Sequence, residues 1–375
     1  MWHQNLKKQV LGLLRAKTGF PTSERKSGKG GKTSLLRVFI FCLAIGLGLS
    51  WLTPQVAKSQ QKPKDAEITL VSFAVTKAAY DRIIPKFVEK WKRENNGQFV
   101  KVNQSYGGSG SQTRAVIDGL DADVVHLALA FDTSRIQQAG LIKAGWEREV
   151  PNNGIVSKSV VALVTREGNP KKINGWSDLA RNGISVITAN PKTSGVARWN
   201  FLALWGSVTK TGKNEQEARK FVTQVYRNVL VLPKDAREAS DTFYKQGQGD
   251  VLINYENEIL LGRQKGEKEP FVIPQVNISI ENPVAVVDKN VDKHGTRRVA
   301  EAFVKYLYTP EAQQEFAKVG FRPVNTTVAG EFSRNFPSIG KLFTANDLGG
   351  WDGIQRKFFA DGALFDQIQA ELGKR

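Results

Sequence analysis

Two glycine-rich turns, residues 106–111 and 193–198, most constrain the fold of this chain, because each follows an apolar run and precedes a helix-like stretch. Glycine lets a backbone approach a ligand closely, and the first N–H groups of a helix lack partners within the helix. The positive end of the helix dipole faces the same way. We call these turns the first clamp and the second clamp, because two such turns facing each other can hold a small tetrahedral oxyanion.

Strand-like and helix-like patterns alternate along the chain, which predicts an α/β fold with mainly parallel sheets. Its 375 residues exceed a usual single core, so we expect two lobes. The expected strands are residues 68–73, 99–104, 122–130, 159–166, 183–188, 251–255 and 282–288. The expected helices are residues 76–93, a helix from 111, and 198–206, 215–227, 297–308 and 310–319, of which the last two should finish the fold. The strand at 159–166 should cross to the second lobe, and the strand at 282–288 should bring the chain back.

Residues 1–58 read as an export leader. They contain ten basic residues and one acidic residue, and so carry half of the net charge of +18. Their uncharged apolar core, residues 38–52, is short for a membrane span. We expect a cleaved signal peptide, with a retained membrane anchor as the alternative. Beyond residue 58 no run of Lys and Arg carries interleaved aromatic residues, so no nucleic-acid partner is expected.

The chain beyond this leader contains no sulfur, because the only methionine is Met1 and the only cysteine is Cys42. This excludes disulfides, thiolate metal sites and cysteine nucleophiles from that part. Three histidines in the whole chain are too few for a histidine metal cluster, and His126 lies in an apolar run typical of the core. Ser109 and Ser194 lack the Gly-x-Ser-x-Gly elbow of a serine nucleophile. We therefore expect no metal, no cofactor and no enzymatic activity.

Several motifs in the same order resemble the periplasmic sulfate-binding proteins of bacterial ABC importers, over about residues 67–368. The motifs are residues 104–110, 127–132, 185–195, 197–200, 250–253, 256–258 and 305–308. The resemblance implies an α/β, two-lobed periplasmic-binding-protein fold of type II. Each lobe would be a mainly parallel sheet flanked by helices, with the ligand in the cleft between lobes. We expect lobe one to comprise residues 66–160 and 275–375, and lobe two residues 161–274.

In that family uncharged hydrogen-bond donors hold the anion. Carried over by position, the resemblance implies a hydroxyl donor at Ser194, a ring donor at Tyr255, and main-chain donors at Ala74, Ser109, Gly195, Val196 and Ala236. Three of these depart from the family pattern, because Ala74, Val196 and Tyr255 stand where the family usually has Asp, Gly and Trp. Any non-proline residue supplies a main-chain N–H, whereas a phenol reaches differently from an indole and can also accept.

Neither clamp contains an acidic residue, which favours sulfate over hydrogenphosphate, since the proton of hydrogenphosphate requires an acceptor. Asp235, beside Ala236, is the one acid that could intrude. Arg198 and Arg237 either polarise the clamp amides from behind or lie as solvated or salt-bridged surface residues. We expect a periplasmic monomer that captures sulfate and delivers it to the permease subunits of an ABC importer. The alternatives are thiosulfate, phosphate or molybdate as the main ligand, and an enzyme acting on an oxyanion ester with the same scaffold.

Overall fold

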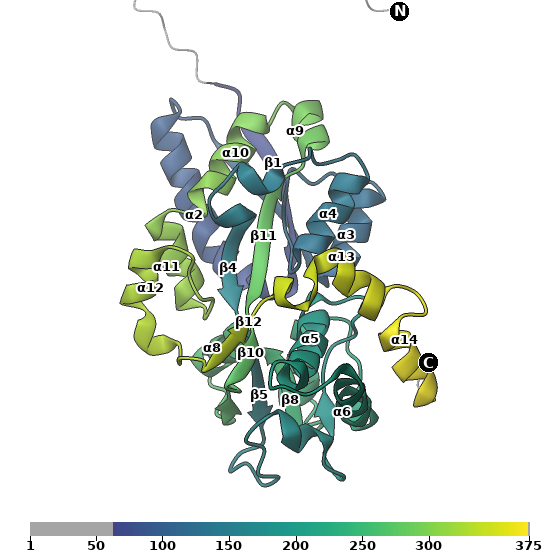
Figure 1. Ribbon diagram of the computed structural model, residues 1–375. Helices are drawn as coiled ribbons and strands as arrows, with labels where there is room; N and C mark the ends of the chain where they lie inside the picture. Colours follow the sequence, from purple (N-terminus) through teal and green to yellow (C-terminus); the bar gives the residue numbers. More distant parts are fainter. Residues whose placement is uncertain (1–62, 374–375) are drawn as a thin grey trace, which may run out of the picture. The chain divides into compact units, whose positions relative to one another are not determined.

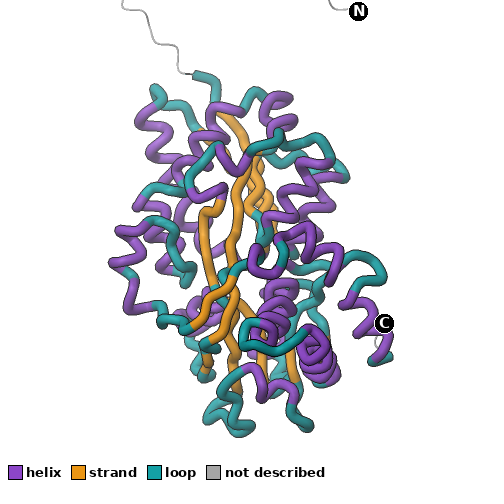
Figure 2. The backbone as a smooth tube through the Cα atoms, viewed as in Figure 1, coloured by secondary structure: helices purple, strands orange, loops and turns teal. Residues whose placement is uncertain are grey.

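The computed structural model describes residues 63–373, so the predicted leader lies outside the described residues. Two five-stranded sheets carry helices along their faces, and we call each sheet with its helices a lobe (Figures 1 and 2). The first sheet has the order β2 (Val100–Gly107), β1 (Ala66–Phe73), β3 (Val124–His126), β11 (Ile280–Val286) and β4 (Ile155–Ser159). The second has the order β7 (Val229–Val231), β6 (Val186–Ile187), β8 (Val251–Tyr255), β5 (Val161–Thr165) and β9 (Phe271–Val272).

The helices follow the same division. Lobe one carries α2 (Lys77–Glu94), α3 (Ser109–Ile117), α4 (Ala130–Gln138), α9 (Asp288–His294), α10 (Arg297–Tyr306), α11 (Pro310–Lys318) and α12 (Thr326–Glu331). Lobe two carries α5 (Gly195–Thr209), α6 (Glu215–Arg227), α7 (Ala236–Tyr244) and α8 (Glu256–Gln264). Short 3-10 turns are η1 (Ala74–Thr76), η2 (Trp146–Arg148), η3 (Asn152–Gly154), η4 (Trp176–Ala180), η5 (Ser333–Asn335) and η6 (Asn346–Leu348). Within residues 63–373, no helix is both long enough and apolar enough to span a bilayer.

Both sheets are mixed, and the direction of each strand follows from how the chain crosses between lobes. β1, β2 and β3 are parallel to one another, as are β6, β7 and β8. β4 runs almost directly into β5, whereas β11 carries the chain back into the first sheet. Because outgoing and returning segments run in opposite directions, β11 pairs antiparallel with β4. β11 is also antiparallel to β3, and β5 is antiparallel to both β8 and β9. The strands that lead into the two clamps, β2 and β6, are parallel to their neighbours.

Each predicted strand and helix named above has a counterpart, and the strand at 251–255 and the helix at 215–227 match β8 and α6 residue for residue. The strands expected at 122–130 and 183–188 are much shorter, because only the residues of β3 and β6 are paired there. The expectation that the helices at 297–308 and 310–319 finish the fold is wrong. The chain continues through β12 (Lys341–Phe343), which pairs with β10 (Val276–Ile278), and then through α13 (Gly350–Ile354), the π-helical turn η7 (Gln355–Phe359) and α14 (Leu364–Glu371). These pieces are too short for their periodicity to be recognised. The predicted lobe boundaries remain a prediction.

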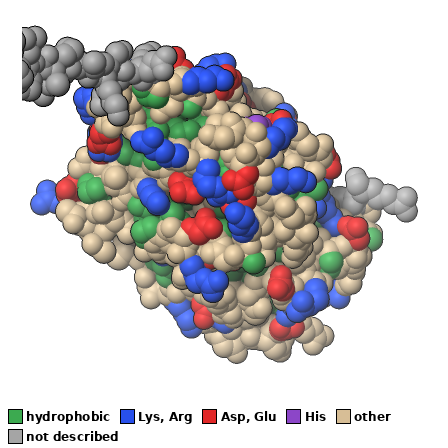
Figure 3. All heavy atoms as spheres, turned by 90° about the horizontal axis from the view of Figure 1, so that it is seen from above, with side chains coloured by type: hydrophobic (Ala, Val, Ile, Leu, Met, Phe, Trp, Pro, Cys, Tyr) green, Lys and Arg blue, Asp and Glu red, His purple; other side chains and the backbone are tan. Residues whose placement is uncertain are grey.

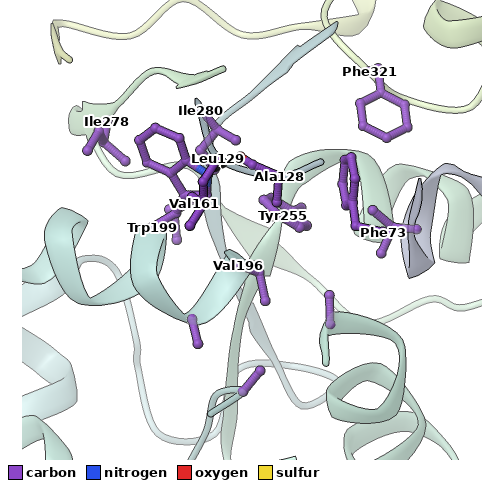
Figure 4. Packing of buried hydrophobic residues seen from close by; sticks show 14 of the residues in the cluster. Phe73, Ala128, Leu129, Val161, Val196, Trp199, Tyr255, Ile278, Ile280 and Phe321 are labelled. Atoms are coloured by element: carbon purple, nitrogen blue, oxygen red, sulfur yellow. Dashed lines mark hydrogen bonds between the residues drawn. The ribbon is translucent and has the colours of Figure 1, made fainter. Parts of the chain in front are cut away.

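The apolar core continues from one sheet to the other through the crossing strands. Figure 4 shows Val161 and Ile280, which belong to different sheets, close to Leu129 and Trp199. His126 is fully buried in the core of lobe one, where its Nδ1 lies 2.7 Å from the hydroxyl of Tyr80. This confirms the prediction of a core histidine. Burial lowers the pKa of His126 to about 3, so the ring is neutral in the folded protein.

Charges of both signs are interspersed on the face of the described residues that Figure 3 presents. Lys and Arg side chains on that face alternate with Asp and Glu. This face of the molecule therefore has no continuous basic surface of the kind that tracks a phosphate backbone.

Candidate functional site

All seven predicted site residues line one cavity between the lobes. The space at this site is small, with about 190 Å³ free of protein atoms, part of which is open to solvent. Its size suits a small ion rather than a sugar or a peptide. The predicted residues in its wall are Ala74, Ser109, Ser194, Gly195, Val196, Ala236 and Tyr255. The wall also contains Gly107 and Gly108 of the first clamp and Asp235, the acid that the sequence analysis named. Phe73, Val75 and Ala128 complete it, and the sequence did not single these three out.

Five helical segments begin at this cavity. In three of them the first residue follows a strand directly or after one residue, namely η1 after β1, α3 after β2 and α8 after β8. The other two, α5 and α7, begin at Gly195 and Ala236, and both of these residues line the cavity. The first N–H groups of a helix have no partner within the helix, so η1, α3, α5 and α7 bring donors together at one point. The first two N–H groups of α8 are already used, because they donate to the carbonyl oxygen of Val160 at 2.9 Å and to the hydroxyl of Ser159 at 3.4 Å. Such an arrangement attracts an anion.

Glycine is needed in both clamps because the two lobes approach each other closely. A Cβ atom on Gly108 would lie 2.5 Å from the carbonyl oxygen of Thr193, in the second clamp. A Cβ atom on Gly195 would lie 2.4 Å from the Cβ of Ala128, in lobe one. The backbone of Gly108 has an ordinary φ of −62°, so space rather than backbone conformation requires glycine there. The two clamps therefore face each other at contact distance, as the sequence predicted.

In the first clamp the hydroxyl of Ser109 already makes two hydrogen bonds within the protein. It donates to the carboxylate of Asp132 at 2.6 Å and accepts from the N–H of Ala128 at 2.9 Å. Burial raises the pKa of Asp132, while nearby Arg198 acts against that shift. The main-chain N–H is therefore what Ser109 can offer an anion, which is the role the sequence assigned to it.

In the second clamp the Ser194 hydroxyl remains available. Ser194 is the N-cap residue of α5, but its side chain makes no capping bond. Arg198 is buried and donates from Nε to the carbonyl oxygen of Pro191 at 2.9 Å, so it holds the loop that leads into the clamp. A surface position for Arg198 is thus wrong, because its aliphatic stem and head are covered. Arg237 forms an ion pair with Glu258, with Nε 3.0 Å from Oε1.

Tyr255 contributes a buried hydroxyl without a hydrogen-bond partner among the described residues. Its ring lies 6.1 Å from that of Phe73, and Figure 4 shows both rings near Ala128. Burial, reinforced by the negative charge of Asp132, raises the pKa of the phenol well above its ordinary value. The phenol therefore keeps its proton. An unpaired buried hydroxyl is costly, and an anion in the cavity would remove that cost by accepting its hydrogen bond.

Asp235 is the one acidic residue in the cavity wall. Its Oδ1 accepts from the N–H of Glu238 at 3.0 Å and so caps α7. Capping engages one of its two carboxylate oxygens. Among residues 63–373 no group of three or more metal-ligating side chains occurs.

The comparisons with known proteins agree with this geometry. Residues 68–322 match the family described as bacterial extracellular solute-binding protein. The sulfate-binding protein of Synechococcus elongatus is 61% identical over 310 residues, which are 82% of this chain and 88% of that protein. The thiosulfate-binding protein of Pseudomonas aeruginosa is 38% identical over 301 residues, which are 80% of this chain and 90% of that protein. The structure of the sulfate-binding protein SubI from Mycobacterium tuberculosis is 40% identical with a TM-score of 0.72, and the match covers 79% of this chain and 100% of that one.

Proposed function

The chain belongs to the bacterial extracellular solute-binding proteins and, within them, to the group of sulfate-binding proteins; on that premise we propose that it captures sulfate for an ABC importer. It is a binding protein rather than an enzyme. The single observation that carries the choice of ligand is the cavity wall, in which helix N-termini and two hydroxyl side chains face one small space.

This wall supports sulfate because sulfate is a dianion whose oxygens only accept hydrogen bonds. A buried dianion is tolerated where fixed dipoles and N–H groups replace its water shell. The donors we propose are the N–H groups of Ala74, Ser109, Gly195, Val196 and Ala236 and the hydroxyls of Ser194 and Tyr255. Hydrogenphosphate would need an acceptor for its proton, and Asp235 already uses one oxygen as a helix cap.

Thiosulfate is the second candidate ligand, supported by the identity with the thiosulfate-binding protein of P. aeruginosa. Its terminal sulfur is larger and a poorer acceptor than oxygen. A wall made of N–H and O–H donors at fixed positions would therefore hold thiosulfate less tightly than sulfate. The higher identity with sulfate-binding relatives agrees with this order.

The family works outside the cytoplasm, and we propose that this chain reaches the periplasm through the leader in residues 1–58. There it acts as a monomer, and closure of the two lobes on the anion presents their outer surfaces to the permease subunits of the importer. Closure by hinge motion is the usual behaviour of two-lobed binding folds. Retention of the leader as a membrane anchor is the alternative that N-terminal sequencing of the exported protein decides.

Calorimetric titration with sulfate, thiosulfate, phosphate and molybdate, each added to the purified chain at pH 7, tests the proposed ligand. We expect one sulfate per chain, thiosulfate weaker than sulfate, and sulfate binding that persists in excess phosphate. Stronger binding of phosphate or molybdate than of sulfate would contradict the proposal. Sulfate recovered chemically unchanged after incubation supports a carrier, whereas turnover of a sulfate or phosphate ester would indicate an enzyme.

A further inference from the structure

The last part of the described chain, residues 341–373, packs against the second clamp from outside the cavity, and we call it the strap. It begins at β12, where Lys341 lies opposite Val276 of β10, and continues through α13, η7 and α14. Figure 1 shows the strap in yellow beside α5 and α6. It lies beyond residue 322, at which the match to the solute-binding protein family ends.

Three sets of contacts, which we call ties, join the strap to the second clamp and its neighbours. The first tie holds the turn that leads into the second clamp. Lys192, directly before that clamp, donates from Nζ to the carboxylate of Asp366 at 2.8 Å and to the carbonyl oxygen of Phe359 at 3.4 Å. The same Asp366 oxygen accepts from the N–H of Gly362 at 2.8 Å, which fixes the carboxylate at the start of α14. The position of Lys192 therefore depends on the strap.

A second tie runs through Arg198, the last residue of the second clamp. Its Nη1 donates to Oε1 of Gln355 at 3.4 Å, and its guanidinium carbon lies 5.3 Å from the ring centre of Phe359. The same Nη1 lies 4.0 Å from the carboxylate of Asp132, and the guanidinium carbon lies 5.7 Å from the ring centre of Phe131, both on α4. One buried side chain of lobe two is thus held by the strap and by lobe one together.

A third tie is a pair of tryptophans that reaches across the cleft. The rings of Trp351 and Trp199 meet edge to face with centres 4.8 Å apart. The Nε1 of Trp199, on α5, donates to the carbonyl oxygen of Ala128 in lobe one at 2.9 Å. Ala128 lines the cavity, so separation of the clamps would break this bond. α13 itself also contacts α4 of lobe one.

We propose that the strap stabilises the closed arrangement of the two clamps and thereby slows release of the bound anion, with Trp351 and Asp366 as positioning residues. This proposal rests on the proposed function, because the anion that is released is the sulfate proposed there as the ligand. No strap residue is among those that line the cavity, so the strap acts through the position of the second clamp. Its three ties all end on residues within or directly beside that clamp.

Variants of the full chain separate this role from a merely structural one. We expect Trp351→Ala to release radiolabelled sulfate about three- to tenfold faster than wild type after dilution into unlabelled sulfate, because an aromatic pair is lost. Asp366→Asn should release it about two- to fivefold faster. The control is Phe303→Leu, because Phe303 lies outside the strap and packs on Tyr80 and Phe87 in the core of lobe one. It should lower the unfolding temperature and leave the release rate unchanged.

Closure is measured directly by the distance between spin labels on the two lobes. Labels at Lys90→Cys in α2 and Lys220→Cys in α6 are specific once Cys42, the only cysteine, is replaced by Ser. With and without sulfate, Trp351→Ala should shift the distances toward a more open molecule than wild type, and Phe303→Leu should not. Release rates and distances equal to wild type in Trp351→Ala would overturn the strap proposal, as would equal acceleration of release by Phe303→Leu. Absence of sulfate binding by the wild-type chain would contradict the proposed function. The distances between the two labels in the unliganded wild type and variants would then still test the role of the strap.

Discussion

The two clamps present similar backbone amides but are held in place differently. The first clamp is fixed inside its own lobe, where the Ser109 hydroxyl links Asp132 to the N–H of Ala128. The second clamp is held by contacts outside its own turn. Lys192, directly before it, bonds the strap, and Arg198, its last residue, reaches both the strap and lobe one. The difference indicates that the first clamp is a preformed half-site, whereas the second is correctly placed only when its surroundings are closed around it.

The charged side chains near the two clamps are not the residues that line the cavity. Charged groups lie near both clamps, but the cavity wall itself contains no Lys or Arg. Arg198 donates to the carbonyl oxygen of Pro191, and a donor at a carbonyl strengthens the polarity of the peptide group behind it. Positive charge thus supports the anion through the backbone, while direct contacts are left to uncharged donors. The four predictions below test how far each clamp depends on its own support.

The largest effect is expected from a negative charge in the second clamp. Val196 lines the cavity, and Val196→Asp places a carboxyl group of similar shape beside the bound dianion. That group must be repelled or protonated, and protonating an ordinary aspartate at pH 7 costs about 4 kcal/mol, or roughly a thousandfold in Kd. Val196→Asn, the neutral control, should keep most of the affinity in a calorimetric titration. Equal loss in both variants would show that shape rather than charge governs this clamp.

Acid should weaken the lobe of the first clamp. The folded-state pKa of His126 is about 3, below its ordinary value of 6.5, so the unfolded chain binds the extra proton between these pH values. Its contribution to stability is complete above about pH 6.5 and is lost as the pH falls, by roughly 3 kcal/mol at pH 4.5. Urea unfolding from pH 7 to pH 4.5 measures this slope. The variant His126→Gln should reduce the slope, and an unchanged slope would assign the acid sensitivity to other groups.

The third prediction concerns Tyr255, whose side-chain donor lies outside both clamps. Removal of the Tyr255 hydroxyl in Tyr255→Phe should weaken sulfate binding by about 1.5–3 kcal/mol, because a hydrogen bond to a charged group is lost. The pKa of this phenol is raised well above 10, so wild-type affinity should stay constant from pH 6 to about pH 9. Titration calorimetry at several pH values checks both statements. Unchanged affinity in Tyr255→Phe would remove the phenol from the site.

The smallest effect on binding is expected from Ser109→Ala in the first clamp. The substitution keeps the main-chain N–H but removes the hydroxyl that serves the buried Asp132, so it should lower the free energy of unfolding by about 1–3 kcal/mol. The Kd for sulfate should change by less than about threefold, since no proposed donor is lost. Denaturant unfolding and calorimetry on the same preparation measure the two quantities. A large loss of affinity at unchanged stability would show that the hydroxyl itself contacts the anion.

The sequence predicted the two clamps because local chemistry determines them. A glycine turn between a strand and a helix restricts what the backbone can do there, so Gly195 and Ser109 were recognisable from their neighbours. The roles of Ala74, Val196, Ala236 and Tyr255 came only from the family resemblance. Such residues carry no local signal, because an N–H donor is the same whatever side chain it bears.

Contacts between distant segments were beyond the reach of sequence reasoning. The closeness of Gly108 to Thr193 depends on how two lobes meet. Arg198 was expected either behind the clamp amides or on the surface, and only the arrangement of α4 and the strap buries it. The strap consists of elements of three to eight residues, in which no apolar period repeats often enough to be recognised.

The most direct measurement is a crystal structure of the chain grown with sulfate. The account predicts one sulfate in the cavity between the clamps, within hydrogen-bond distance of main-chain N–H groups and of the Ser194 and Tyr255 hydroxyls. It also predicts no lysine or arginine nitrogen in contact with the ion. Sulfate bound elsewhere on the molecule, or held in this cavity chiefly by charged side chains, would contradict the account.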